Sequence, residues 1–133
     1  MSAAENKDLV RRFYAEAING RDLDAVDRLL GEDFAHDGER RGREGQRQAV
    51  AAFLDGFFDL RNEILLILAE GDLVAAHQRW AGTHDGEFLG FAPTGRRVEF
   101  TSTAVLRVAD GLIVAAWDQV DLLGLTRQID SSP

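Results

Sequence analysis

The spacing of apolar residues changes once along this 133-residue chain, near residue 60, and the change constrains the fold class. Before residue 60, apolar side chains recur every three or four positions, which is the period of an amphipathic helix. The pattern predicts three helices, over about residues 9–19, 22–30 and 44–58. Asn19-Gly20 and Gly31 are suitable stops for the first two helices.

After residue 60 the apolar residues form short runs, several of them alternating with polar residues, as in strands. The runs predict four strands, over residues 63–69, 73–83, 97–108 and 112–121. Gly71-Asp72 and Asp110-Gly111 are typical hairpin turns and pair the strands into two consecutive hairpins. Three smaller predictions complete the chain: a brief extended piece at Phe34-Ala35, a long connection over 82–95, and a short turn or helix over 122–129.

Helices followed by hairpins predict an α+β fold in one domain, residues 1–133. We expect the three N-terminal helices to pack against a strongly curved, mostly antiparallel sheet. Such a sheet can wrap around the helices and leave an internal pocket between the two layers.

Charge and composition exclude several classes of protein. The net charge of −8 argues against a nucleic-acid-binding surface, because phosphate contacts need clustered Lys and Arg. The absence of cysteine excludes disulfides and thiolate metal sites. The polar first eight residues lack the apolar core of a signal peptide, and no apolar run is long enough to span a bilayer. We therefore expect a cytoplasmic protein without membrane or nucleic-acid partners.

Asp118 stands in the middle of the apolar run 112–121. Because strand residues alternate between faces, Val114, Ala116 and Val120 are predicted to share its face, with Ile113 on the other. Desolvation there would raise the pKa of the carboxyl and suit it to proton transfer near neutral pH. A structural ion pair with an arginine of a neighbouring strand is an equally good interpretation of the pattern alone.

Several segments, in order along the chain, resemble the SnoaL-like polyketide cyclase family. They are Asn6-Lys7-x-Leu9-Val10-x-x-Phe13-Tyr14, Asn19-Gly20-x-x-Leu23-Asp24, Phe34-x-His36-Asp37, Gly82-Thr83-His84-x-Gly86-Glu87-Phe88-Leu89-Gly90, Pro93-Thr94-Gly95-Arg96 and Asp110-Gly111-x-Ile113-Val114-x-x-Trp117-Asp118-x-x-Asp121. The resemblance covers about residues 5–128. It implies the cone-shaped α+β fold shared with nuclear transport factor and ketosteroid isomerase, commonly found as a dimer.

The resemblance also implies a cofactor-independent enzyme that closes a polyketide ring by intramolecular aldol condensation. The family aspartate that acts as acid and base matches Asp118. Relatives often carry Glu-His-Trp-Asp at this point, whereas Ala115-Ala116 precede Trp117-Asp118 here. Two alternatives stay open: a double-bond isomerase of the ketosteroid isomerase type, and a non-catalytic dimeric protein that binds a small ligand.

The candidate site contains eight residues. Asp118 and His36 are the predicted catalytic pair, and the remaining six are predicted to contact a hydrophobic substrate: Tyr14, Phe53, Phe57, Gln78, Trp80 and Ala116. Tyr14 and Trp80 are equally well read as ordinary core residues. His36 is also compatible with a histidine that simply packs at the edge of a loop.

No metal or cofactor is expected, because the histidines at 36, 77 and 84 have no paired ligand spacing. A homodimer is expected, because polar residues alternate with apolar ones along 73–83 and 97–108 and leave one sheet face for water or a partner. The outward residues of that face are His77, Arg79, Glu99, Thr101 and Thr103. Leu122, Leu123 and Leu125 are further candidates for an exposed interface.

Overall fold

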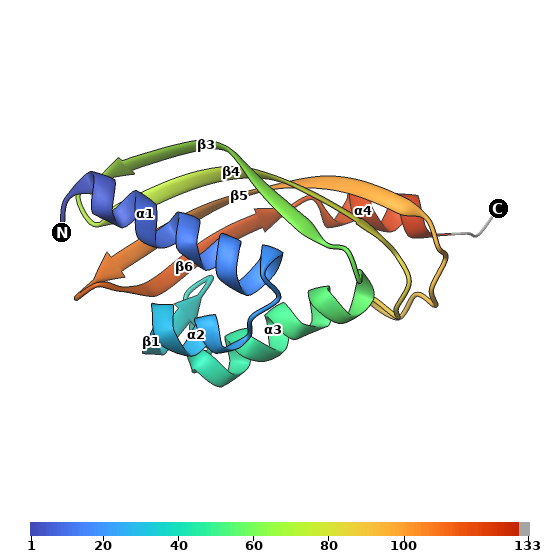
Figure 1. Ribbon diagram of the computed structural model, residues 1–133, viewed down its shortest axis with the longest axis horizontal. Helices are drawn as coiled ribbons and strands as arrows, with labels where there is room; N and C mark the ends of the chain where they lie inside the picture. The colour runs from blue at the N-terminus through green and yellow to red at the C-terminus, as the bar shows by residue number, and fades with distance from the viewer. Residues whose placement is uncertain (131–133) are drawn as a thin grey trace.

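A computed structural model describes residues 1–130 as a layer of helices packed on one face of a curved sheet (Figure 1). The elements in chain order are α1 (Ala3–Phe13), the π-helical turn η1 (Tyr14–Asn19), α2 (Asp24–Leu29), β1 (Leu30–His36), β2 (Glu39–Arg40), α3 (Gly42–Gly56), β3 (Arg61–Glu70), β4 (Leu73–Thr83), β5 (Arg97–Ala109), β6 (Leu112–Val120) and α4 (Leu122–Ile129). The α+β prediction and the three N-terminal helices are confirmed. None of the helices described is both long and apolar enough to cross a membrane.

The first helix begins at Ala3, well before its predicted start near residue 9. Ser2 caps α1 and forms a capping box with Glu5, while Leu9, Val10 and Phe13 turn inward. The helix then continues without a break into η1, where Tyr14 and Ile18 are buried. A π-helical turn is uncommon, and such turns often lie at functional sites.

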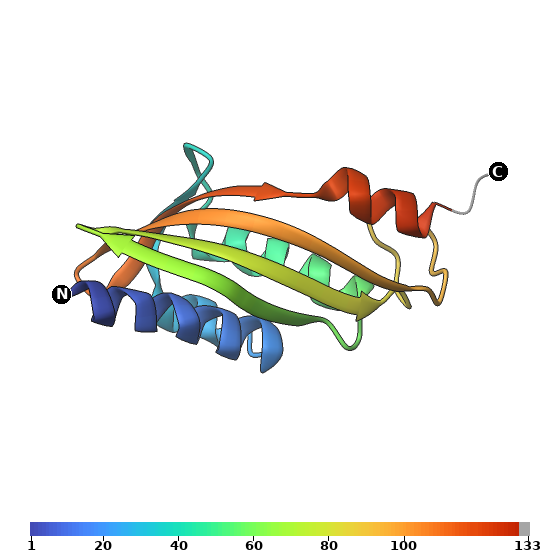
Figure 2. The ribbon, with the colours of Figure 1, turned by 90° about the horizontal axis from the view of Figure 1, so that it is seen from above.

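The sheet has six strands in the order β2-β1-β6-β5-β4-β3, and only the β1–β6 pair is parallel. The prediction of a mostly antiparallel sheet is therefore confirmed. The sheet is curved but open, and β3 forms one of its edges (Figure 2). Its inner face and the helices enclose the core, in which Val74, Ala76 and Leu106 are buried.

The N-terminal half contributes more to the sheet than the sequence predicts. The brief extended piece at Phe34-Ala35 belongs to the seven-residue strand β1, and β2 pairs with its end. Gly31 does not end α2, because Leu30 is already extended, with φ −104° and ψ 148°. Gly31 instead lies against β6, where a Cβ would come within 3.1 Å of Val114 Cγ1. Its close approach to another strand explains why a turn-like residue occurs there.

The short segment after β6 is a helix, α4, with Asp121 as its N-cap. Leu122 and Leu123 are exposed, as predicted for an interface. The prediction for Leu125 is wrong: its side chain is fully buried, because the helical turn rotates it back toward the core.

Candidate active site

A cavity of about 530 Å³ lies between the helices and the inner face of the sheet. It is lined from α1 and η1, from the end of β1, from α3, from three strands and from the connection between β4 and β5. The lining side chains include Tyr14, His36, Asp37, Arg41, Phe53, Trp80, Phe88, Phe100 and Asp118. A smaller pocket of about 30 Å³ adjoins it and reaches Ala116 and Ile113. The two spaces share Tyr14, His36 and Asp118.

A bulge in β6 determines which of its side chains face this cavity. Arg107 pairs with Ala115 and Val108 pairs with Ile113, so Val114 has no partner of its own on β5. The extra residue shifts the alternation, and Ile113 joins Ala116 and Asp118 on the cavity side. The predicted face is therefore correct for Ala116, Asp118 and Val120, and wrong for Ile113 and Val114.

The Asp118 carboxyl is held in an environment that disfavours its charge. Burial raises its pKa to about 6, the Asp37 charge acts in the same direction, and Arg41 opposes both. Its Oδ1 atom is buried and accepts no hydrogen bond from residues 1–130. Within that part of the chain no ion pair reaches Asp118 either, which argues against the interpretation as a structural ion-pair member.

His36 and Asp37 come from the end of β1 and adjoin Asp118. Asp37 Oδ1 accepts the Asp118 N–H at 3.0 Å, and Asp37 Oδ2 lies 3.3 Å from His36 Nδ1. Burial lowers the pKa of His36, Arg41 lowers it further, and Asp37 partly compensates. The imidazole is therefore neutral at pH 7, and it can both donate and accept a hydrogen bond.

Tyr14 faces the same space from the start of η1. Burial raises the pKa of the phenol far above its usual value, and the neighbouring Asp118 charge adds to the shift. A hydrogen bond with the Gln78 side chain acts in the opposite direction. Tyr14 consequently keeps its proton at neutral pH, and its hydroxyl is available as a hydrogen-bond donor.

Four aromatic side chains form one wall of the cavity. Trp80 and Phe100 stack with ring centroids 5.9 Å apart and planes 2° from parallel. Phe53 stacks against both of them, at 6.0 and 6.3 Å, and Phe88 contacts Phe53 at 4.9 Å. The Trp80 indole N–H donates to Ser102 Oγ at 2.8 Å, so the wall offers flat apolar surface without an unsatisfied donor.

The structure brings six of the eight predicted residues to these two spaces and leaves two behind them. Phe57 is fully buried in the core, where its ring packs against His84 and Phe88. Gln78 is also fully buried, behind Tyr14, and reaches the cavity only through the phenol. Helical periodicity placed Phe57 inward correctly, but it could not distinguish the cavity wall from the core.

Sequence reasoning missed Asp37, Arg41, Phe88 and Phe100 as lining residues. Phe100 could have been found, because it alternates with exposed residues along β5 and pairs with Trp80. Phe88 lies in the connection between β4 and β5, where no periodicity indicates which side chain turns inward. Arg41 comes just before α3 and is exposed; its guanidinium donates to Gln46 Oε1 at 2.7 Å, and both residues line the cavity.

Comparison with known proteins gives the family. The family model described as SnoaL-like polyketide cyclase matches residues 8–129. The chain belongs to the SnoaL-like polyketide cyclase family. It is 30% identical over 128 residues to aklanonic acid methyl ester cyclase DauD of Streptomyces sp. (strain C5). The aligned region covers 92% of this chain and 80% of DauD. It is 31% identical over 129 residues to the cyclase of the same name, DnrD, of Streptomyces peucetius, covering 92% and 88%.

A solved structure of the same fold is TsrD from Streptomyces laurentii. It superposes with a TM-score of 0.89 at 30% identity, covering 99% of each chain. The agreement extends over the whole SnoaL-like domain.

The resemblance described above implies a histidine at the position of Ala116. Ala116 lines the smaller pocket beside Asp118, so a histidine at this position would occupy part of that space. His36 is the histidine that lies next to Asp118. His77 bonds to Thr103 Oγ1 at 2.7 Å on the outer face of the sheet, and His84 bonds to Thr94 Oγ1 at 3.0 Å inside the connection between β4 and β5.

A metal centre would need several ligating side chains to converge. Residues 1–130 contain no group of three or more His, Cys, Asp or Glu side chains in such an arrangement.

Proposed function

We propose that this protein catalyses an intramolecular aldol cyclisation of a hydrophobic polyketide-like carbonyl compound, without a cofactor. One observation carries the proposal: in a member of the SnoaL-like family, an aromatic-walled cavity is lined by Asp118, whose buried Oδ1 has no hydrogen-bond partner among residues 1–130. A carboxyl with a pKa of about 6 is poised both to take and to return a proton near neutral pH. DauD and DnrD are named as aklanonic acid methyl ester cyclases, which supports the methyl ester of a carboxylic acid as the substrate.

The reaction needs one base, one acid and one hydrogen-bond donor. Ionised Asp118 would remove a proton from the carbon next to a substrate carbonyl, and the resulting enolate carbon would attack a second carbonyl of the same molecule. The new carbon–carbon bond leaves an alkoxide, which would take the proton back from Asp118. Tyr14 would donate a hydrogen bond to the oxygen on which negative charge develops. Neutral His36, with its single N–H at Nδ1 beside Asp37, would accept a hydrogen bond from the substrate at Nε2. Phe53, Trp80 and Ala116 would contact the ring system.

Aklanonic acid methyl ester is the direct test substrate. An intramolecular aldol reaction conserves mass, so liquid chromatography with mass detection should show a new peak of unchanged mass. Asp118→Asn should lower the turnover by about 10²- to 10⁴-fold, the usual contribution of a positioned acid/base. Trp117→Phe is the matched control, because Trp117 is the neighbouring residue on the outer face, where Arg107 covers its ring. Equal turnover by Asp118→Asn and the wild type would refute the assignment.

The alternative function, double-bond isomerisation, needs the same two groups. It proceeds through a dienolate, whose formation also requires a carboxylate base and a hydroxyl donor. Incubation with a β,γ-unsaturated 3-ketosteroid separates the two reactions, because isomerisation produces a conjugated enone with strong ultraviolet absorbance. Binding of both compounds without turnover of either would favour the non-catalytic ligand-binding function instead.

We further propose a homodimer that packs through the outer face of the sheet. Thr101 and Thr103 alternate with buried residues on β5, and Arg79 pairs with Glu63 across β3 and β4 at 2.7 Å. The exposed Leu66 and Leu68 on β3 add apolar surface at the edge of this face, at 66% and 71% exposure.

A further inference from the structure

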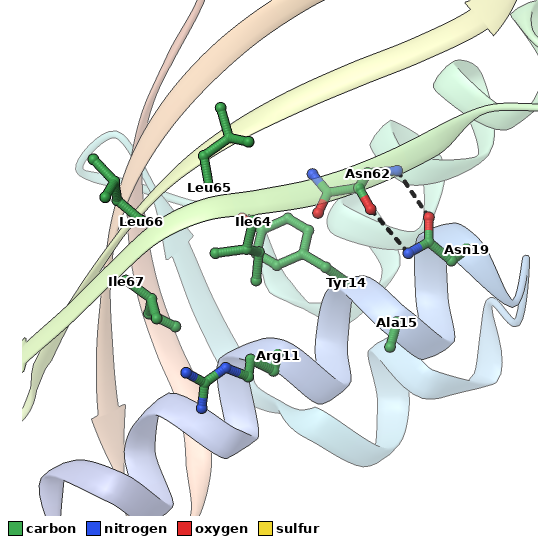
Figure 3. A pocket seen from close by; sticks show the side chains of 9 residues that line it. All are labelled: Arg11, Tyr14, Ala15, Asn19, Asn62, Ile64, Leu65, Leu66 and Ile67. Carbon is green, nitrogen blue, oxygen red and sulfur yellow. Dashed lines mark hydrogen bonds between the residues drawn. The ribbon is translucent and has the colours of Figure 1, made fainter.

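A chain of side-chain amides lies behind Tyr14 and connects it to the edge strand of the sheet. Asn19, the last residue of η1, donates from Nδ2 to the Asn62 carbonyl at 3.0 Å, and its Oδ1 accepts the Asn62 N–H at 2.8 Å. Figure 3 shows these two bonds beside the Tyr14 ring. Tyr14 and Asn19 are the two ends of η1. The two hydrogen bonds from Asn19 to β3 therefore hold the turn that carries the phenol.

The Asn62 side chain continues the chain of amides inward. Its Nδ2 donates to Gln78 Oε1 at 2.6 Å, and both side chains are buried. The Gln78 carbonyl is therefore turned toward Asn62, and its amide nitrogen is turned away from it. One N–H of Gln78 Nε2 donates to the Ala76 carbonyl at 3.5 Å, and the second is free to donate to the phenol oxygen; a hydrogen bond with Gln78 lowers the pKa of Tyr14.

The consequence concerns the proton of the Tyr14 hydroxyl. If Gln78 donates to the phenol oxygen, the O–H of Tyr14 is not used by Gln78 and can point into the space that Tyr14 shares with Asp118. If Gln78 were rotated by 180° about its terminal bond, its carbonyl would face the phenol instead and take that O–H. The Asn62 donor favours the first arrangement, because the rotated amide would turn its own N–H groups toward Asn62 Nδ2 and leave that buried donor without an acceptor, which is costly.

We infer that Asn62 is a positioning residue: by holding the Gln78 carbonyl, it makes Tyr14 a hydrogen-bond donor to an oxyanion in the cavity. The inference rests on the proposed function, because such a donor matters for catalysis only where an enolate or alkoxide oxygen forms. It extends the site to a strand, β3, that contributes nothing to the cavity lining itself.

Two features of the protein allow a sharp test. Tyr14 is its only tyrosine, so protein labelled with carbon-13 at the tyrosine Cζ gives a single resonance that reports on this hydroxyl. The bonds from Asn19 use the backbone of Asn62, so Asn62→Leu removes the side-chain amide and leaves the connection to η1 in place. The probe is 2-naphthol, whose ionised form is a flat mimic of an enolate.

We expect Tyr14→Phe and Asn62→Leu each to weaken naphtholate binding by about tenfold or more, the value of a hydrogen bond to a charged oxygen. The Tyr14→Phe/Asn62→Leu double variant should bind no more weakly than Tyr14→Phe alone, because Asn62 acts through the phenol. The Tyr14 resonance should shift when naphtholate binds to the wild type and should shift much less in Asn62→Leu.

Asn6→Leu is the matched control. Asn6 is also a buried asparagine, it donates to the Gly71 carbonyl at 3.3 Å, and it has no bond to this chain of amides. It should leave naphtholate affinity unchanged. If Asn62→Leu does not fold, Asn62→Ala removes the same donor to Gln78 Oε1 with a smaller side chain and should give the same loss.

Additive losses in the double variant would overturn the inference, as would an unchanged Tyr14 resonance in Asn62→Leu or a wild type that does not bind naphtholate. The readout is binding, so it is independent of turnover. A protein that passes this test and fails to cyclise polyketide esters would contradict the proposed function alone.

Discussion

At the scale of single residues, Asp118 combines burial with the absence of a hydrogen-bond donor to Oδ1 in the described part of the chain, residues 1–130. Its pKa is about 6 in the fold, against an ordinary value of 3.8, so the ionised form destabilises the native state. The sign follows from proton binding: the penalty is absent below pH 3.8, grows as the pH rises to about 6, and is complete above it.

Asp118→Asn should therefore increase the free energy of unfolding at pH 8, by at most about 3 kcal/mol, and the difference should vanish near pH 4. Denaturant titration at both values of pH measures it. Asp110→Asn, in the exposed turn between β5 and β6, should change stability by less than about 0.5 kcal/mol at either pH. A loss of about 3–5 kcal/mol in Asp118→Asn would instead mean that the variant strands a buried cation.

The same titration predicts the pH dependence of turnover. Because the base must be ionised, kcat/KM should rise with pH and level off above an apparent pKa near 6. Asp37→Asn removes a charge that raises the pKa of Asp118, so its midpoint should move to lower pH. Arg41→Gln removes a charge that lowers this pKa, so its midpoint should move to higher pH. If the pH profiles of kcat/KM had the same midpoint in the wild type, Asp37→Asn and Arg41→Gln, a group other than Asp118 would control the rate.

At the scale of elements, the end of α3 is stabilised by a distant arginine. Arg21 donates from Nη2 to the Leu54 carbonyl at 2.7 Å and from Nη1 to the Phe57 carbonyl at 3.1 Å. A cation at a helix C-terminus satisfies free carbonyls and interacts favourably with the helix dipole. Since α3 carries Phe53, these bonds also hold one part of the aromatic wall.

Arg21→Ala should lower the free energy of unfolding by about 1–2 kcal/mol. Arg28→Ala is the control, because Arg28 is an exposed arginine that pairs only with carboxylates, Glu16 at 2.9 Å and Asp22 at 2.8 Å. It should cost less than about 1 kcal/mol, as exposed ion pairs do. Chemical denaturation of the two variants compares them, and equal losses would contradict the capping role.

The elements also show how far the sequence could predict the fold. A long alternating run such as Leu73–Thr83 predicts correctly that the segment is a strand and that the side chains of Gln78 and Trp80 point inward. The local sequence pattern mispredicts secondary structure and side-chain direction where pairing between distant strands determines them. The bulge at Val114 moves Ile113 to the inner face, and Leu30 becomes strand only because β6 lies beside it. The aspartate of the candidate site was predictable from its unusual apolar strand, whereas Arg41 depends on a loop whose course no periodicity describes.

At the scale of the whole molecule, the outer face of the sheet bears on the proposed dimer. Thr101 is exposed on β5 and pairs with Arg79 on β4. Thr101→Arg would place two like charges opposite each other across two strands and repel a second sheet packed there. Gln48→Arg adds the same charge on the exposed side of α3 and serves as the control.

Light scattering at micromolar concentration should give twice the monomer mass for the wild type and for Gln48→Arg. The mass of Thr101→Arg should fall toward that of a monomer. A wild type with monomer mass at every concentration would exclude the dimer, and an unchanged dimer in Thr101→Arg would exclude this face as its interface.

The pairing of β1 with β6 has a consequence for how the molecule folds. Asp37 and Asp118 are 81 positions apart in the chain, yet they meet through the sheet's parallel pair. Closing such a long loop costs entropy before its contacts form, so contacts of this kind slow folding and tend to form late. The hairpins β3–β4 and β5–β6 are local and can form early. The carboxylates of the site would then come together only after most of the sheet exists, and until that moment the aromatic wall would face water.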